Sequence, residues 1–169
     1  LDKAYASEIF GEVLFEGRDD TIYVLTIEAA IGIADPEYVA ADMLSQAEHD
    51  ELAAALCVTT SMSTALKIQR AIEDQLRWTK RQAITFKSLE KYGAIIVARG
   101  MTEALQLANT IAPEHVELIV KQPERLARRI RNAGAIFLGA YSTPPLGDYL
   151  AGPNHVLPTG GSARFFSPL

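Results

Sequence analysis

Apolar, strand-like runs alternate with helix-like segments along most of this sequence, and this alternation constrains the fold more than any other feature. The strand-like runs are TIYVLTI (21–27), AALCVTT (54–60), GAIIVA (93–98), HVELIV (115–120) and AIFLG (near 134–139). Apolar spacing predicts helices over residues 4–14, 36–50, 63–89, 102–112 and 123–132. Strands that are apolar on both faces and separated by helices are typical of a parallel sheet covered on both sides. The sequence therefore predicts the α/β class: a Rossmann-like three-layer sandwich with a mostly parallel sheet, as a single domain over residues 1–169.

Charge and composition restrict the classes of partner. The formal net charge is -5 and the sequence pI is about 5.2, so no general field attracts phosphate backbones or anionic lipid. We expect neither nucleic acid nor a membrane surface as a partner. No run approaches the roughly 20 apolar residues of a membrane-spanning helix, and the acidic N-terminus lacks the layout of a secretory signal. We therefore expect a cytoplasmic protein.

The single cysteine, Cys57, lies in a strand-like run, where we expect it to be buried. One cysteine excludes an internal disulfide and a thiolate-cluster metal site, and it suits a reducing compartment.

Two polar pairs and one loop hold the candidate functional residues. Gln46 and His49 are three apart near the end of a predicted helix, so they share one face and could bind one metal ion. An amide oxygen and an imidazole suit zinc if an acidic ligand comes from elsewhere. Asp148 is the obvious acidic candidate. Taken alone, such a pair is commoner as surface residues at a helix end.

The second pair, Glu114–His115, follows Ala112-Pro113, where a helix ends and a strand begins. A carboxylate beside an imidazole can share general acid–base work near neutral pH. Taken alone, such a pair is more often an ordinary polar helix end.

After Gly139 the sequence becomes dense in Gly and Pro and contains Asp148, Tyr149 and His155. Loops of this length are often functional, although an ordinary structured loop remains open. Ligands of open α/β sheets gather at the carboxyl ends of strands, where this loop would emerge. The sequence has neither G-x-G-x-x-G after a strand nor a P-loop, so no cofactor-binding residues are assigned.

Four segments together resemble histidinol dehydrogenases in wording, order and spacing: ADMLSQAEHD, IAPEHVELIV, GAIFLG and GDYLAGPNHVLPTGGSAR. The resemblance covers about residues 31–169 and implies an enzyme of histidine biosynthesis that oxidises L-histidinol through an aldehyde to L-histidine, with NAD as hydride acceptor. It implies a catalytic zinc ion on Gln46, His49 and Asp148. It also implies that the substrate site contains Gln46, His49, His115, Asp148, Tyr149 and His155. Glu114 and His115 match the family's catalytic pair, in which the glutamate activates water and the histidine takes protons.

The resemblance also predicts that this chain is incomplete. The family's enzyme has a preceding domain with most of the NAD site, and a C-terminal segment whose histidine reaches the zinc of the partner subunit in a homodimer. The family has a Gly-Pro-Ser-Glu stretch before a strand, whereas RDDTIYVLTIEAA stands here at 18–30. We therefore expect residues 1–30 to be a helix–strand leader from outside the family.

Three origins are open for such a chain: an excised domain with a foreign leader, a chimera with another α/β protein, or a divergent relative. Two functions follow from them. The chain either retains NAD-dependent dehydrogenase activity, or is a stable, monomeric α/β scaffold without activity of its own. A zinc hydrolase using Gln46, His49 and Asp148 is a third function, with only the ligand types in its favour.

Overall fold

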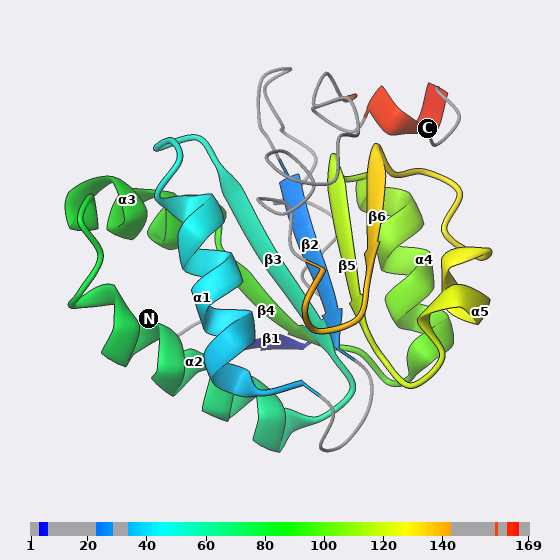
Figure 1. The fold of residues 1–169 in the computed structure, drawn as a ribbon, viewed down its shortest axis with the longest axis horizontal. Helices are drawn as coiled ribbons and strands as arrows, with labels where there is room; N and C mark the ends of the chain where they lie inside the picture. The colour runs from blue at the N-terminus through cyan, green and yellow to red at the C-terminus, as the bar shows by residue number, and fades with distance from the viewer. Residues whose placement is uncertain (1–3, 7–22, 29–33, 143–157, 159–161, 166–169) are drawn as a thin grey trace.

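The computed structural model describes residues 4–6, 23–28, 34–142, 158 and 162–165. The strands form a parallel sheet with helices on both faces (Figure 1). The strands are β1 (Ala4–Ala6), β2 (Tyr23–Glu28), β3 (Ala54–Thr59), β4 (Ala94–Val97), β5 (His115–Ile119) and β6 (Ala135–Leu138). The helices are α1 (Pro36–Ala47), α2 (Met62–Leu76), α3 (Gln82–Tyr92), α4 (Met101–Ile111), α5 (Pro123–Ala127) and the short 3-10 helix η2 (Ser162–Phe165). None of these helices is long and apolar enough to span a bilayer.

All recorded strand pairs are parallel, in the order β1-β4-β3-β2-β5-β6. From β2, the chain adds β3 and β4 on one side and then β5 and β6 on the other. This reversal between β2 and β5 is the switch point of a Rossmann-like sheet. The predicted fold class is confirmed.

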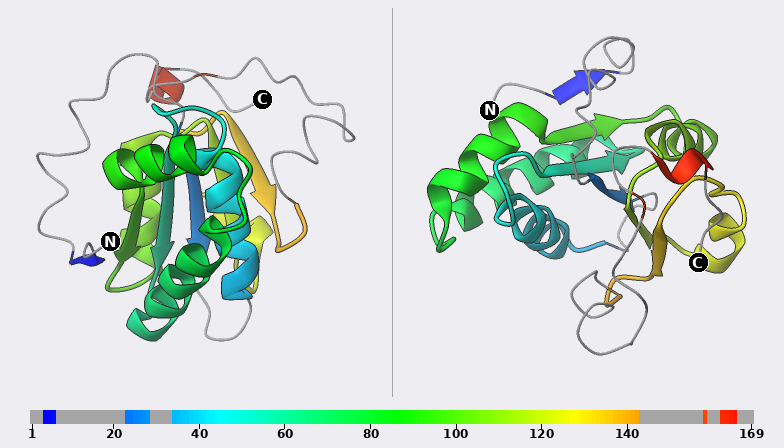
Figure 2. Two further views of the ribbon diagram at one scale, coloured as in Figure 1. Left: turned by 90° about the vertical axis from the view of Figure 1, so that its left-hand side faces the viewer. Right: turned by 90° about the horizontal axis from the view of Figure 1, so that it is seen from above.

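Strand β3 shows how one sheet serves two cores. Ala54, Leu56 and Val58 belong to the core beneath α4, whereas Ala55 and Cys57 belong to the core beneath α1, α2 and α3. All six β3 residues are buried, as the apolar run predicted, and Cys57 is fully buried. Figures 1 and 2 show α1 and α4 on opposite faces of the sheet, which completes the three layers.

Most predicted elements are confirmed, including the start of α1. Asp35 caps this helix by accepting a hydrogen bond from the Glu37 amide at 3.0 Å, and Pro36 occupies the first turn. The predicted helix over 4–14 is wrong for residues 4–6, which form edge strand β1 beside Ile95–Val97 of β4. The outer edge of β4 exposes backbone N–H and C=O groups. Hydrogen bonding to these groups stabilises a strand at residues 4–6 more than their helix-like apolar spacing stabilises a helix. Residues 7–14 lie outside the described part of the chain.

The single helix predicted over 63–89 is in fact two, because the chain turns between Arg77 and Arg81. Thr79 donates hydrogen bonds to the Leu76 carbonyl from its hydroxyl at 3.0 Å and from its amide at 3.3 Å. A threonine hydroxyl that takes a backbone carbonyl in this way competes with helix continuation. The turn lets α3 lie against β3, where Leu89 joins the core.

Helix α5 ends at Ala127, earlier than the predicted Asn132. Asn109 of α4 accepts hydrogen bonds from the Arg131 amide at 2.6 Å and the Asn132 amide at 3.2 Å, and donates to the Arg129 carbonyl at 2.9 Å. These bonds occupy the backbone groups that a longer helix would have used.

Gly93 ends α3 at a position where a side chain does not fit. A Cβ there would lie 2.7 Å from the Leu89 carbonyl oxygen and 2.9 Å from the Leu89 Cα, both backbone atoms. We expect Gly93→Ala to lower the free energy of unfolding by about 1–3 kcal/mol, measured by urea denaturation. Gly100→Ser is the matched control, because Gly100 has open space around its Cα and is a helix N-cap, where serine is favoured. Equal stability of the two variants would contradict the steric account.

Candidate functional site

The four described candidate residues lie at one edge of the sheet. Helix α1 runs back from the carboxyl end of β2 to the amino end of β3, so Gln46 and His49 lie where the strands begin. His115 is the first residue of β5, and Glu114 immediately precedes it. The end of α1 and the start of β5 both lie toward the top of Figure 1.

This position differs from the carboxyl-end site expected for an open α/β sheet. The turn after β6 does emerge at the carboxyl edge, where the Tyr141 ring lies 6.3 Å from that of Tyr38 in the first turn of α1. The four described candidates lie at the opposite edge. The remaining predicted site residues, Asp148, Tyr149 and His155, lie outside the described residues.

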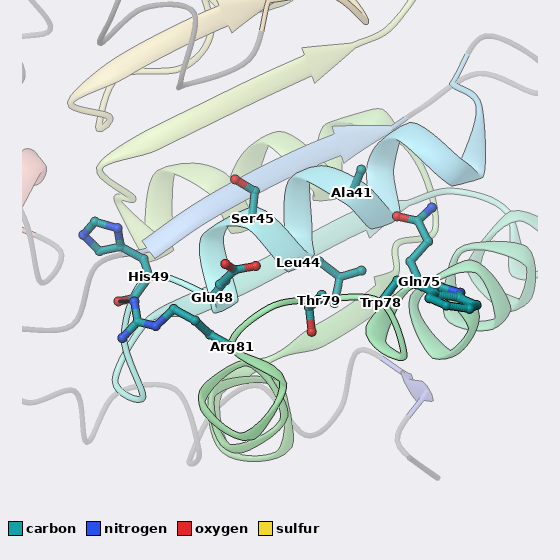
Figure 3. Close-up of a pocket in the computed structure, with 9 residues that line it drawn as sticks. All are labelled: Ala41, Leu44, Ser45, Glu48, His49, Gln75, Trp78, Thr79 and Arg81. Atoms are coloured by element: carbon teal, nitrogen blue, oxygen red, sulfur yellow. Dashed lines mark hydrogen bonds between the residues drawn. The ribbon is translucent and has the colours of Figure 1, made fainter.

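Gln46 and His49 occupy the last turn of α1 and the residues just beyond it. Gln46 is half-buried and His49 is exposed, and the His49 amide donates to the Gln46 carbonyl at 3.1 Å. Arg81, from the turn between α2 and α3, donates from Nη1 to the His49 carbonyl at 3.1 Å (Figure 3). The loop after His49 is also tied to α3, because Lys87 pairs with Glu51 at 2.9 Å. These contacts hold the His49 backbone while leaving its ring accessible.

A groove of about 540 Å³ runs beside this turn, between α1 and the end of α2 (Figure 3). It is lined by Ala41, Leu44, Ser45, Glu48, His49, Gln75, Trp78, Thr79 and Arg81. His49 is the one candidate residue among those that line it, so the groove borders the candidate site.

Glu114 and His115 are held more firmly than the first pair. Ala112 ends α4 in the left-handed conformation, with φ 51°, and Pro113 then prevents the helix from continuing. Both Glu114 and His115 are buried, at 7% and 8% exposure, and His115 Nδ1 lies 4.0 Å from Glu114 Oε1. The Glu114 carbonyl accepts from the Ala135 amide at 2.8 Å. A buried carboxylate and imidazole this close suit proton transfer.

The His115 ring is positioned by the neighbouring strand. Its centroid lies 5.7 Å from that of Phe137 in β6, at an interplanar angle of 44°. In the sheet His115 stands between Val24 of β2 and Ala135 of β6. The catalytic candidate therefore lies next to the switch point of the sheet, but at its amino edge.

Asp42 and Glu117 form a third polar pair, which was not among the candidates predicted from the sequence. Glu117 lies in β5 with 1% exposure, and its side chain is hydrogen-bonded to that of Asp42 in α1. Burial raises the pKa of Asp42 to about 6, against the lowering effect of the hydrogen bond to Glu117. A glutamate within the apolar run HVELIV was the available signal, because acidic residues are almost never fully buried without a partner.

The raised pKa of Asp42 predicts a pH-dependent stability. The folded state holds this proton more tightly than the unfolded state, so the stabilisation is complete below pH 3.8 and is lost as the pH rises through about 6. We expect urea unfolding to show about 1–3 kcal/mol more loss of stability over this interval in the wild type than in Asp42→Asn. The asparagine cannot titrate, so identical pH profiles would contradict a raised pKa.

The described residues fit part of a zinc site. Within the described ranges no three His, Cys, Asp or Glu side chains cluster to hold a metal ion. Gln46 and His49 offer an amide oxygen and an imidazole nitrogen from one helix end, which are donors that zinc accepts. A complete site needs further ligands, and Asp148 is the predicted one.

Comparison with known proteins identifies the family. A family model described as histidinol dehydrogenase matches residues 26–169. The curated histidinol dehydrogenase of Caldanaerobacter subterraneus is 57% identical over 136 residues, which are 80% of this chain and 32% of that protein. Those of Syntrophotalea carbinolica and Bacillus cereus are 52% and 56% identical, over 95% and 96% of this chain and 37% of each relative. This chain thus spans about a third of the length of the relatives it matches.

A solved structure agrees. The crystal structure of histidinol dehydrogenase from Elizabethkingia anophelis matches with a TM-score of 0.82 and 36% identity, over 88% of this chain and 34% of that one. The family match begins within β2, and the two alignments over 95% and 96% of the chain necessarily include part of residues 1–30. The sequence relationship therefore extends further toward the N-terminus than the four motifs do. This chain belongs to the histidinol dehydrogenase family.

Proposed function

We propose that this chain supplies the zinc- and substrate-binding part of an NAD-dependent enzyme that oxidises L-histidinol to L-histidine in histidine biosynthesis. The observation that carries the proposal is the placement of Gln46–His49 and Glu114–His115 at one edge of the sheet in a member of this family. A metal-binding pair and an acid–base pair on neighbouring elements are what a metal-assisted alcohol oxidation requires.

The residues divide the work by their chemistry. Gln46, His49 and Asp148 would hold zinc, which when bound orients the amine and imidazole of histidinol and polarises its oxygen. Asp148, Tyr149 and His155 would complete the substrate site. NAD carries the hydride chemistry.

Proton transfer belongs to the buried pair. His115 is the base that accepts the proton of the substrate alcohol, as the hydride leaves. Glu114, 4.0 Å from the imidazole, stabilises the charged ring and activates the water that adds to the aldehyde. Burial of both groups keeps bulk water from competing for these protons.

A second candidate function is a scaffold that keeps these residues without catalysing the reaction alone. The chain covers 37% of the Bacillus cereus relative, and this candidate concerns that portion taken on its own. The family resemblance implies a homodimer whose subunits share the zinc site, and an NAD site largely in another domain. On this account the chain is a cytoplasmic monomer that binds zinc weakly and NAD with negligible affinity.

Turnover of L-histidinol with NAD separates the two functions. The chain is assayed for NADH formation beside the complete Bacillus cereus enzyme, and NAD binding is measured by calorimetry. NADH formation by the chain supports catalysis. If the chain is inactive where the relative turns over, and NAD does not bind at millimolar concentration, the scaffold account holds. Sub-millimolar NAD affinity would contradict the scaffold account.

A further inference from the structure

The Asp42–Glu117 contact joins the two elements that carry the proposed site. In β5, Val116 and Leu118 pack in the core with α4, whereas Ile119 packs in the core with α1. Side chains alternate along a strand, so Glu117 and His115 face the same side as Ile119. Glu117 therefore lies on the α1 face of the sheet, two residues along β5 from His115, the proposed base.

Asp42 has the corresponding place on α1. Asp42 and Gln46 are at positions i and i+4 of α1, which lie on one stripe of the helix, and His49 follows just beyond the helix end. Asp42 is thus one turn before the first proposed zinc donor, on the same stripe.

The hydrogen bond between the two side chains defines their shared protonation. Two ionised carboxylates contain no donor, so a hydrogen bond between Asp42 and Glu117 requires one proton. Because Glu117 is 1% exposed, two negative charges in this place would carry a large desolvation cost. While one of the two carboxyl groups holds a proton, the pair is a carboxylic acid bonded to a carboxylate.

The spacing on the two elements matches. From Asp42 to Gln46 a helix rises about 6 Å, at about 1.5 Å per residue. From Glu117 back to His115 a strand spans about 6.6 Å, at about 3.3 Å per residue. Both steps lead toward the amino edge of the sheet, so the contact brings Gln46 to the height of His115.

We propose that Asp42 and Glu117 are positioning residues, a hydrogen-bonded carboxyl pair that sets the register of α1 on β5. This register aligns the helix end that carries Gln46 and His49 with Glu114–His115. The role in catalysis rests on the proposed function, whereas the register does not. Neither residue touches the reacting atoms.

Two substitutions of the same shape test the pair. Asp42→Asn keeps a hydrogen-bonding group toward Glu117 with its amide as the donor, whereas Asp42→Leu removes the hydrogen bond. Asp74→Leu controls for the loss of an acidic residue, because the Asp74 side chain is 74% exposed on α2. If Asp42→Leu does not fold, Asp42→Ala takes its place.

Zinc binding alone, by calorimetry on the metal-free chain, is the first readout. We expect Asp42→Leu to weaken zinc binding about tenfold or more, while Asp42→Asn and Asp74→Leu stay within about threefold of the wild type. The second readout needs no metal: the NMR signals of the Gln46 side-chain amide and the His115 ring. These signals should shift in Asp42→Leu and keep their positions in Asp42→Asn.

The two readouts separate the failure of each proposal. A wild-type chain that binds no zinc would contradict the proposed metal site, and the NMR comparison would still decide the register. A folded Asp42→Leu variant with unchanged Gln46 and His115 signals would overturn the positioning role. Equal effects of Asp42→Leu and Asp42→Asn on these signals would overturn the hydrogen-bonded pair.

Discussion

Replacing His49 by alanine is expected to weaken zinc binding by at least about 100-fold. His49 is exposed at the end of α1, with its backbone carbonyl held by Arg81 at 3.1 Å, so its imidazole is available without rearrangement of the fold. Loss of a group that only orients a ligand costs about 10–100-fold in metal affinity, and loss of the ligand itself should cost more. Calorimetric titration of zinc into the metal-free chain measures the change.

Glu48→Gln is the matched control for His49→Ala. Glu48 is the adjacent residue and also lines the groove, but it is not among the proposed ligands. We expect its zinc affinity to stay within about threefold of the wild type. Equal losses in the two variants would indicate non-specific attraction of the cation to this surface, and would remove His49 from the site.

Replacing Leu56 by alanine is expected to lower the free energy of unfolding by about 3–5 kcal/mol. Leu56 is fully buried in β3, between Leu25 of β2 and Ala94 of β4 in the strand register. It belongs to the core beneath α4, and neighbours fixed in a sheet cannot close the cavity that a smaller side chain would leave. Urea denaturation monitored by circular dichroism measures the loss.

Leu66→Ala on α2 removes the same atoms from a residue that is 44% exposed. Its expected cost is below about 1 kcal/mol, because little buried volume is lost and alanine favours a helix. If Leu56→Ala were no more destabilising than Leu66→Ala, β3 would not lie in the core of the protein.

The fold could be predicted where apolar runs are long and bounded by clear signals. The runs that became β3, β4 and β5 and the Asp35-Pro36 helix start each had a local cause. The predictions that were wrong concern segments whose structure depends on contacts with residues far away in the sequence. Residues 4–6 join a sheet edge because β4 offers one, and α5 stops early because Asn109 of another helix takes its backbone groups. The apolar spacing within a segment carries no information about either contact.

The local placement of the candidate residues could be predicted from the sequence, but their position relative to the sheet could not. Spacing predicted that Gln46 and His49 share a helix end, and Pro113 marked Glu114–His115 as a strand start. Spacing could not show that both pairs lie at the amino edge, because that depends on strand order. The Asp42–Glu117 contact was also beyond reach, since it joins residues 75 positions apart (117 − 42) on different elements.

Titration of L-histidinol into the chain, with and without saturating zinc, tests the central claim most directly. The account predicts heat of binding with zinc present, a much weaker signal in its absence, and no zinc-dependent binding in His49→Ala. Zinc binding without any histidinol binding would contradict the claim that this edge of the sheet is the substrate site.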